Sequence, residues 1–309
     1  MGMATVMLLG GVLAAGLGGE LFVRSVIGFA RWARIPAAIA AATLGAFATS
    51  SPELFVSTIA ALNGKPTIGL GDATGSNVVN IALILAVALL LKPVRARRRD
   101  MRLDYWTALV TSLLLATLAV DGTIDAGDGV LLMGTFVVWV SAHVRRALTE
   151  RARPVEDQPV SSYRVVIDGV AGLLLLILAG HLVVDGAKTI AGAFGIPPFL
   201  IGATIVALGT STPELATTLI AQWRGHDHVS VGTLLGSNVF NGLFIVGLTA
   251  VITPIPVQTS GVWIALGAAL YAVALTLPGS SERLGRHRGV ILIAGYVAYA
   301  SLLAVFGSH

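Results

Sequence analysis

The sequence predicts an all-α polytopic membrane protein, with ten transmembrane helices arranged as two inverted-topology repeats of five. Three observations predict this fold class: a strongly apolar composition, basic residues confined to alternate loops, and a polar motif that recurs 161 positions later. Hydrophobic residues make up 55% of the 309 residues, charged residues only 12%, and the mean hydropathy is +0.86. A soluble domain is roughly 45–50% apolar, so this composition excludes an ordinary soluble protein.

Apolar stretches close to the ~20 residues that cross a bilayer recur along most of the chain, and these are the expected spans. The first has no Lys or Arg ahead of its hydrophobic run, which distinguishes it from a cleaved signal peptide. The first five expected spans are residues 3–22, 37–62, 67–91, 104–120 and 127–144. The second five are residues 165–185, 198–222, 229–252, 258–277 and 288–307.

The loops between these spans alternate in charge. All Lys and Arg residues except Lys65 and Lys188 lie in the loops after odd-numbered spans. In chain order these loops hold the arginines of 24–34, the cluster 92–102, the segment 145–164, Arg224, and the arginines of 283–288. Positively charged loops remain in the cytoplasm, so both termini are expected outside. Removing any one span would break the alternation, so each span is supported in turn.

The polar segment 145–164 is the expected cytoplasmic linker, a flexible tether without chemistry of its own. It separates the first five-helix repeat, residues 1–144, from the second, residues 165–309. The basic pI of about 9.8 reflects the charged loops rather than a nucleic-acid surface. The chain has no cysteine, which excludes disulfides and thiolate chemistry.

A constant offset of 161 residues aligns the two halves without a gap. Ile35-Pro36 falls on Ile196-Pro197, and Gly71 falls on Gly232. Because five spans is an odd number, the second copy must enter the membrane from the opposite side. Inverted duplication is typical of secondary transporters, whose binding site lies at the repeat interface near the midplane. The alternative is a duplicated structural module without transport, which the polar residues at the repeat centres disfavour.

The recurring motif is Thr49-Ser50-Ser51-Pro52-Glu53, repeated as Thr210-Ser211-Thr212-Pro213-Glu214. A carboxylate at membrane depth costs several kcal/mol unless it faces a wet cavity or a counter-ion, so an intramembrane Glu indicates a functional site. Each proline lacks an amide proton and is expected to break its helix, which frees backbone oxygens that must line a cavity or bind something. The alternative for each carboxyl is a protonated, packed side chain.

A second motif lies one span further on in each half. Ser76, Asn77 and Asn80 are spaced to share one helix face, as are their counterparts Ser237, Asn238 and Asn241. Gly75 and Gly236 are expected to allow close helix approach, although Ser and Asn in membrane helices are often packing residues alone. Together the motifs offer an all-oxygen ligand set suited to a hard cation such as Ca²⁺ or Na⁺. Two glutamates balance one Ca²⁺ or two Na⁺, which is a basis for competition between these ions.

The paired motifs Ala-Thr-Ser-Ser-Pro-Glu (48–53) and Gly-Thr-Ser-Thr-Pro-Glu (209–214), each followed by Gly-Ser-Asn-Val-x-Asn, resemble the alpha repeats of the cation/Ca²⁺ exchanger superfamily. The chain is most similar to prokaryotic Na⁺/Ca²⁺ exchangers, with alpha repeats at 37–91 and 198–252. The resemblance implies an antiporter in the cell membrane of a prokaryote, with Ca²⁺ and Na⁺ as transported ions and no cofactor. A monomer is expected, although the sequence leaves the oligomeric state open. It also implies alternating access by sliding of the first and sixth spans.

The resemblance implies a specific set of ion ligands. Glu53 and Glu214 would ligate Ca²⁺, helped by the carbonyls of Thr49 and Thr210, while Asn80 would lie beside the central site. The sodium sites would use both glutamates together with Ser50, Ser76, Ser211 and Ser237 and the backbone oxygens of Ala46 and Ala207. The chain departs from the family pattern at Ala48, which replaces a glycine, and at Asn241, which stands where similar exchangers carry Asp.

The missing charge at Asn241 leaves alternatives open for the coupling ion. These are exchange of Ca²⁺ or another divalent cation against H⁺, and K⁺-dependent exchange. A membrane-embedded hydrolase would need a nucleophile–base pair or a zinc motif, and neither signature contains a histidine. A passive channel is disfavoured because channels commonly build their pores from several subunits.

Two polar loops are expected to be solvated. They are the acidic loop with Asp121, Asp125 and Asp128, and the turn His226-Asp227-His228.

Overall fold

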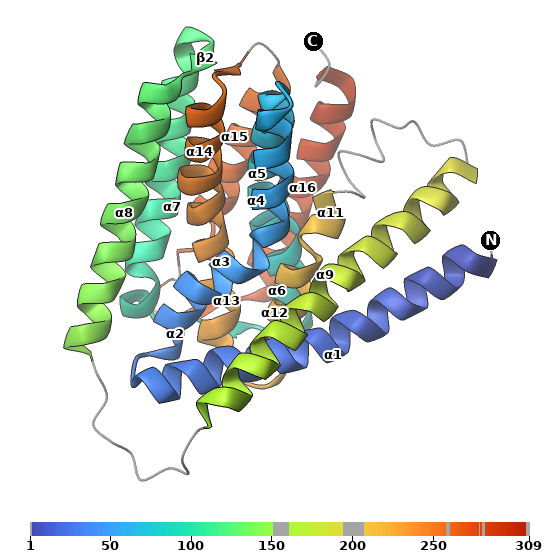
Figure 1. Ribbon diagram of the computed structural model, residues 1–309, viewed down its shortest axis with the longest axis vertical. Helices are drawn as coiled ribbons and strands as arrows, with labels where there is room; N and C mark the ends of the chain where they lie inside the picture. The colour runs from blue at the N-terminus through green and yellow to red at the C-terminus, as the bar shows by residue number, and fades with distance from the viewer. Residues whose placement is uncertain are drawn as a thin grey trace.

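The computed structural model describes residues 2–150, 161–193, 207–257, 260–277, 279 and 282–306. This part of the chain is mainly helical, and most of its helices form an upright bundle (Figure 1). Two long helices, α1 (Gly2–Ala33) and α9 (Ser162–Ala193), pack against each other and cross the lower part of the bundle obliquely.

The centre of the bundle consists of two similar sets of helical segments. The first set is α2 (Ala37–Ala40), the π-helix η1 (Ala41–Gly45), α3 (Ala46–Thr49), α4 (Ser51–Leu62), α5 (Pro66–Val78), the π-helix η2 (Val79–Leu85) and α6 (Ala86–Leu91). The second set is α11 (Ala207–Thr210), α12 (Thr212–Trp223), α13 (Asp227–Val239), the π-helix η5 (Phe240–Ile245) and α14 (Val246–Ile252).

Four further helices flank this centre: α7 (Arg98–Leu118), α8 (Ala126–Thr149), α15 (Ser260–Ala274) and α16 (Arg286–Phe306). A 3-10 turn, η3 (Ala119–Asp121), ends α7. Two antiparallel strand pairs tie the halves together, β1 (Val94–Arg95) with β4 (Arg283–Leu284) and β2 (Thr123–Ile124) with β3 (Ile255–Pro256).

Within the described residues, seven helical stretches are long and apolar enough to cross a membrane, and the bent pair Ala37–Thr49 and Ser51–Leu62 would be an eighth. The most apolar parts of Pro66–Leu91 and Asp227–Ile252 are each 78% buried, against 17–39% for the other five. These two stretches therefore form the core, and the other helices shield them. The prediction of a helical membrane protein is confirmed, whereas the number ten stays a prediction.

Two expected span boundaries are wrong because α1 and α9 continue well beyond them. The first span was expected to end at residue 22, but α1 reaches Ala33, and α9 reaches Ala193 rather than residue 185. In α1, the long side chains of Arg24 and Arg31 allow the helix to continue past the apolar region, since their charged ends can reach the interface. Where the two helices cross, a Cβ on Gly18 would lie 2.9 Å from the carbonyl oxygen of Gly172, so glycine is needed for this close approach.

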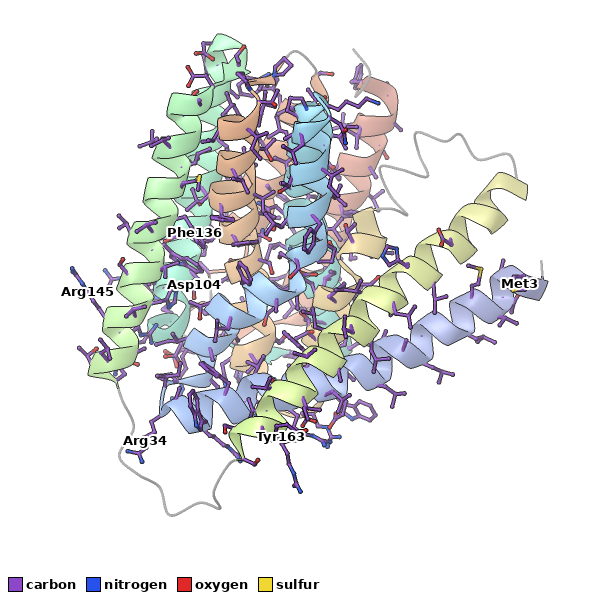
Figure 2. All side chains as sticks on the ribbon, in the orientation of Figure 1. Met3, Arg34, Asp104, Phe136, Arg145 and Tyr163 are labelled. Atoms are coloured by element: carbon purple, nitrogen blue, oxygen red, sulfur yellow. The ribbon has the colours of Figure 1, made fainter. Side chains whose placement is uncertain are left out.

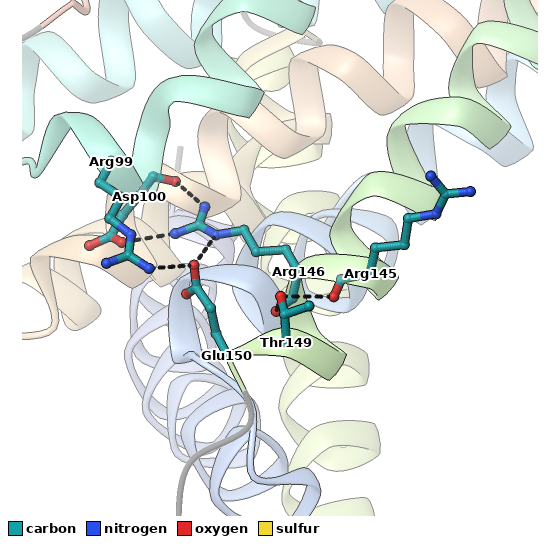
Figure 3. A network of polar contacts seen from close by, with 6 residues as sticks. All are labelled: Arg99, Asp100, Arg145, Arg146, Thr149 and Glu150. Carbon is teal, nitrogen blue, oxygen red and sulfur yellow. Dashed lines mark hydrogen bonds and ion pairs between the residues drawn. The ribbon is translucent and has the colours of Figure 1, made fainter.

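The expected linker 145–164 begins as helix rather than as a loop. Both Arg145 and Arg146 belong to α8, and Arg146 is in its last turn, where its Nη2 lies 3.0 Å from Asp100 Oδ1 and its Nε lies 3.0 Å from Glu150 Oε1 (Figure 3). The hydrogen bond from Arg146 holds the pKa of Glu150 below its usual value, and one from Arg99 adds to this effect. The network joins the ends of α7 and α8; residues 151–160 lie outside the described residues.

Candidate functional site

Both proline-containing motifs interrupt their helices, as the sequence predicts. The first half turns by 46° between α3, which ends at Thr49, and α4, in which Pro52 occupies the first turn. In the second half α11 ends at Thr210 and α12 begins at Thr212, one residue before Pro213. A proline in the first turn costs nothing there, because that N–H has no helical partner anyway.

The break places Glu53 and Glu214 in the first turns of α4 and α12. Both side chains are fully buried, with exposed fractions of 1% and 0%. The positive end of a helix dipole favours an anion at this position. In each carboxylate Oε2 is buried without a hydrogen-bond partner among the described residues. The two carboxylates therefore carry acceptor atoms that the described side chains leave unused.

Hydroxyl groups from both halves surround the carboxylates. Ser50 Oγ donates to Glu214 Oε1 at 2.9 Å, so this bond crosses from one half to the other. Ser237 Oγ donates to Glu214 Oε1 at 3.2 Å, and Ser76 Oγ donates to Glu53 Oε1 at 3.4 Å. Ser50 is the N-cap residue of α4, but its hydroxyl binds this glutamate instead of capping the helix. The structure thus brings together five of the predicted site residues.

The second half does not repeat the Ser50 contact. Ser211 is fully buried, and its Oγ has no partner in the part of the chain that the structure describes. Thr49 is also fully buried; its hydroxyl bonds the Gly45 carbonyl at 3.1 Å and lies 3.5 Å from Ser237 Oγ. The hydrogen-bonding around the glutamates is therefore asymmetric.

The predicted backbone ligands lie at the same breaks. The carbonyl of Ala46 accepts the Ser50 N–H at 3.0 Å, so it is already engaged in the helix. Ala207 and Thr210 form the two ends of α11, directly before Glu214's helix. Residues 194–206, which include the start of the expected span 198–222, lie outside the described residues.

Asn77 and Asn238 form a reciprocal contact at the centre of the bundle. Asn77 Nδ2 donates to the Asn238 carbonyl at 3.1 Å, and Asn238 Nδ2 donates to the Asn77 carbonyl at 3.0 Å. This asparagine pair joins α5 to α13 through residues that are related by the repeat offset. The spacing of the motifs predicts both residues on the site face, but it does not predict that they bind each other.

The remaining two amides differ in their bonding. Asn80 Nδ2 donates to Asn238 Oδ1 at 3.1 Å, whereas its own Oδ1 is unpartnered among the described residues. Asn241 is fully buried, and neither Nδ2 nor Oδ1 has a partner there. Leaving a buried amide group without a hydrogen-bond partner costs about 1–3 kcal/mol of stability. The presence of Asn241 at this buried position therefore requires an explanation. Both lie in π-helical segments, which often occur at functional sites.

Asp72, which the sequence motifs do not indicate, lies on α5 one helical turn before Ser76. Its Oδ2 is buried, and no hydrogen bond or ion pair reaches the side chain within the described residues. Asp72 also interacts electrostatically with Glu53 and Glu214. An acidic residue inside an apolar span could have identified Asp72 as a site residue. The repeat does not point to it, because the related position in the second half is Thr233.

A second buried acidic residue, Asp104, was also missed. Its Oδ1 accepts from Trp139 Nε1 at 3.0 Å and lies 2.7 Å from His143 Nε2, all between α7 and α8. Figure 2 shows Asp104 and Phe136 at neighbouring heights on this side of the bundle. All polar partners of Asp104 come from α8, so this cluster secures the helix pair rather than the central site.

The polar loops have local structural roles. Asp125 and Asp128 form a capping box at the start of α8, with bonds of 3.0 and 3.1 Å; Asp125 is exposed and Asp128 is half-buried. Asp227 Oδ2 accepts the Arg95 N–H at 2.8 Å. Burial lowers the pKa of both His226 and His228, yet His228 is exposed and His226 and Asp227 are only half-buried. The turn 226–228 therefore reaches solvent, as the sequence predicts, while Asp227 also contacts Arg95.

No group of three or more His, Cys, Asp or Glu side chains with metal-binding geometry occurs among the residues that the structure describes. A cavity of about 590 Å³ lies between the lower ends of α1 and α9 and is lined by Glu20, Arg24, Arg31 and Arg224, among others. None of the predicted ion ligands lines it. The candidate site is thus the pair of carboxylates with their hydroxyl and amide neighbours.

Comparison with known proteins gives consistent matches over the whole chain. The family model described as sodium/calcium exchanger protein matches residues 3–144 and 168–305. The putative antiporter CaxA of Alkalimonas amylolytica is 33% identical over 97% of this chain and 98% of its own length. The inner membrane protein YrbG of Escherichia coli K12 is 31% identical, covering 97% of each chain.

More distant relatives extend these similarities. The sodium/calcium exchanger MaX1 of Methanosarcina acetivorans is 27% identical over 93% of this chain and 94% of its own length. Among solved structures, the sodium-calcium exchanger NCX_Mj soaked with Na⁺ and Sr²⁺ matches with a TM-score of 0.82 and 26% identity. That match covers 97% of this chain and 98% of the other.

Proposed function

Because the chain belongs to the sodium/calcium exchanger family, we propose that it exchanges Na⁺ for Ca²⁺ across the cell membrane of a prokaryote. Family membership makes the protein a cation transporter and not an enzyme. The observation that carries the proposal is the pair of fully buried glutamates, each with one oxygen left without a partner among the described residues. Two carboxylates can balance one Ca²⁺ or two Na⁺, so the two ions would compete for them.

The proposed ligands combine side-chain and backbone oxygens, as hard cations prefer. Glu53 and Glu214 hold Ca²⁺ together with the carbonyls of Thr49 and Thr210. Ser76 and Ser237, which already bond the glutamates, would turn their hydroxyl oxygens to Na⁺. The other proposed sodium ligands are Ser50, Ser211 and the backbone oxygens of Ala46 and Ala207, and Asn80 and Asn241 lie beside the central site.

The proposed architecture is ten spans in two inverted repeats, 1–144 and 165–309, with both termini outside and the linker 145–164 in the cytoplasm. The similarity of the two central helix sets supports the duplication, and the charge pattern of the loops supports the orientation. Alternating access would involve α1 and α9 moving against the bundle, since they pack closely on each other and cross it obliquely. The site lies within one chain, so a monomer suffices.

Transport into proteoliposomes tests the coupling ion. ⁴⁵Ca²⁺ uptake should be driven by an outward Na⁺ gradient and not by H⁺ or K⁺ gradients of equal size. Empty liposomes and an ionophore that collapses the Na⁺ gradient provide the controls. Uptake that is independent of the Na⁺ gradient but driven by an H⁺ or K⁺ gradient would contradict Na⁺ coupling. It would show that H⁺ or K⁺ is the coupling ion instead.

The neutral amide Asn241 is the observation that favours such an alternative. Asn241→Asp adds a negative charge beside the glutamates, so we expect a changed Na⁺ dependence or pH dependence of Ca²⁺ uptake. The measurement is the initial uptake rate against Na⁺ concentration at several pH values. Asn80→Asp, on the related position of the first half, is the matched comparison. Profiles identical to those of the wild type would show that position 241 has no part in coupling.

A further inference from the structure

Asp72 occupies a position that links the site to one end of the bundle. It lies four residues before Ser76, so the two side chains share a face of α5, and Asn80 follows in η2. At 1.5 Å per residue, Asp72 is about 6 Å nearer than Ser76 to the start of that helix. The helix begins at Pro66, at the end of the bundle that also holds β2 (Figure 1).

The burial of Asp72 is intermediate between the site and the surface. The residue is partly exposed, whereas its Oδ2 is buried and unpartnered among the described residues. Glu53 and Glu214, by contrast, are fully buried. The carboxyl groups thus form a series from the partly exposed Asp72 to the enclosed pair, and the like charges of the three groups repel one another.

The related position in the second half carries no charge. Thr233, at the repeat offset from Asp72, is fully buried, and its Oγ1 has no partner in the described chain. The position that mirrors Asp72 thus offers a hydroxyl in place of a carboxylate, whereas the aspartates at the other end, Asp100, Asp104 and Asp227, line a cavity beside Gly232. The two halves are similar in backbone but unequal in charge at this position.

We propose that Asp72 is a cation-attracting carboxylate on the path between the β2 end of the bundle and the glutamate pair, and that it makes Ca²⁺ capture stronger from that side. The inference rests on the proposed function. Asp72 lies one helical turn before Ser76 and is partly exposed, which places it before the buried glutamate pair rather than within it. A negative charge on an access path raises the local cation concentration and the association rate.

The test is a side-specific transport measurement on oriented proteoliposomes. In Asp72→Asn, the KM for Ca²⁺ presented at the β2 side should rise on the order of tenfold. The KM at the other side should stay within about twofold, a pattern that general damage to the fold would not produce. Asp72→Glu, which keeps the charge, should restore most of the affinity. Asp121→Asn removes an exposed charge from the same end of the bundle and should change neither KM.

The remaining outcomes distinguish a failure of the role of Asp72 from a failure of the proposed function. Unchanged KM values in Asp72→Asn, or an equal rise on both sides, would overturn the inference while leaving the exchange function intact. If the wild type shows no Na⁺-driven exchange, the proposed function fails separately. In that case stopped-flow Tb³⁺ binding to the purified protein decides: a slower association in Asp72→Asn supports the inference, and an unchanged rate overturns it.

Discussion

Replacement of either Glu53 or Glu214 by Gln is expected to abolish Na⁺-driven Ca²⁺ uptake while the protein still folds. Glutamine keeps the size of the side chain but removes half of the charge that faces the ion. Removing one partner of a buried charge interaction costs about 3–5 kcal/mol, which corresponds to a loss of affinity on the order of a hundredfold or more. The measurement is the initial rate of ⁴⁵Ca²⁺ uptake into proteoliposomes.

A matched control is Glu150→Gln, which makes the same chemical change in the network at the end of α8. This variant should transport at nearly the wild-type rate. Size-exclusion chromatography and circular dichroism would establish that all three variants fold. Wild-type uptake by Glu53→Gln or Glu214→Gln would remove that glutamate from the transport mechanism.

The second large effect is expected at Gly236, where substitution by Ala should destabilise the protein strongly. A Cβ at this position would lie 2.1 Å from the Ala42 carbonyl oxygen and 2.8 Å from the Ala42 Cα, both in the π-helix η1. Because these are backbone atoms, the clash cannot be relieved by a side-chain rotation. Overpacking of this kind costs about 3 kcal/mol, and we expect the thermal midpoint to fall on the order of 5–10 °C.

Gly75→Ala is the internal control, because the repeat relates the two glycines. A Cβ on Gly75 would meet only Tyr299 Oη, at 3.8 Å, which is an ordinary contact. This variant should change stability by less than about 1 kcal/mol. The expectation that both glycines allow close helix approach is therefore wrong for Gly75. Equal midpoints for the two variants, measured by fluorescence in detergent, would contradict the packing described for Gly236.

The sequence was informative wherever a local rule decides the outcome. Pro52 and Pro213 cannot donate a backbone hydrogen bond, so the helix breaks before Glu53 and Glu214 were predictable from residue type alone. The burial of these glutamates followed from their place in apolar runs, since only a helix face turned inward can accommodate them. The helical membrane fold followed from composition for the same reason.

The features that the sequence did not predict depend on contacts between segments that are distant in the chain. The bond from Ser50 to Glu214 joins the two halves, and no local pattern specifies it. The close approach of Gly236 to Ala42 depends on how α13 packs against η1, whereas Gly75 has space around it. Asp72 is not part of the repeat pattern, because the related position in the second half holds Thr233. The C-terminal end of α1 could not be predicted from the apolar run because its arginines continue the helix.

The asparagine pair also bears on how opposite states of the protein would differ. Under the proposed inverted duplication, one state becomes the other when the two halves exchange conformations. The Asn77–Asn238 contact maps onto itself in that exchange, so both of its bonds persist and it serves as a fixed pivot. The Ser50–Glu214 bond maps instead onto Ser211 and Glu53, between which no bond is formed in the described residues. That single hydrogen bond is thus a marker of the state, and its transfer from one serine to the other would report the reversal of access.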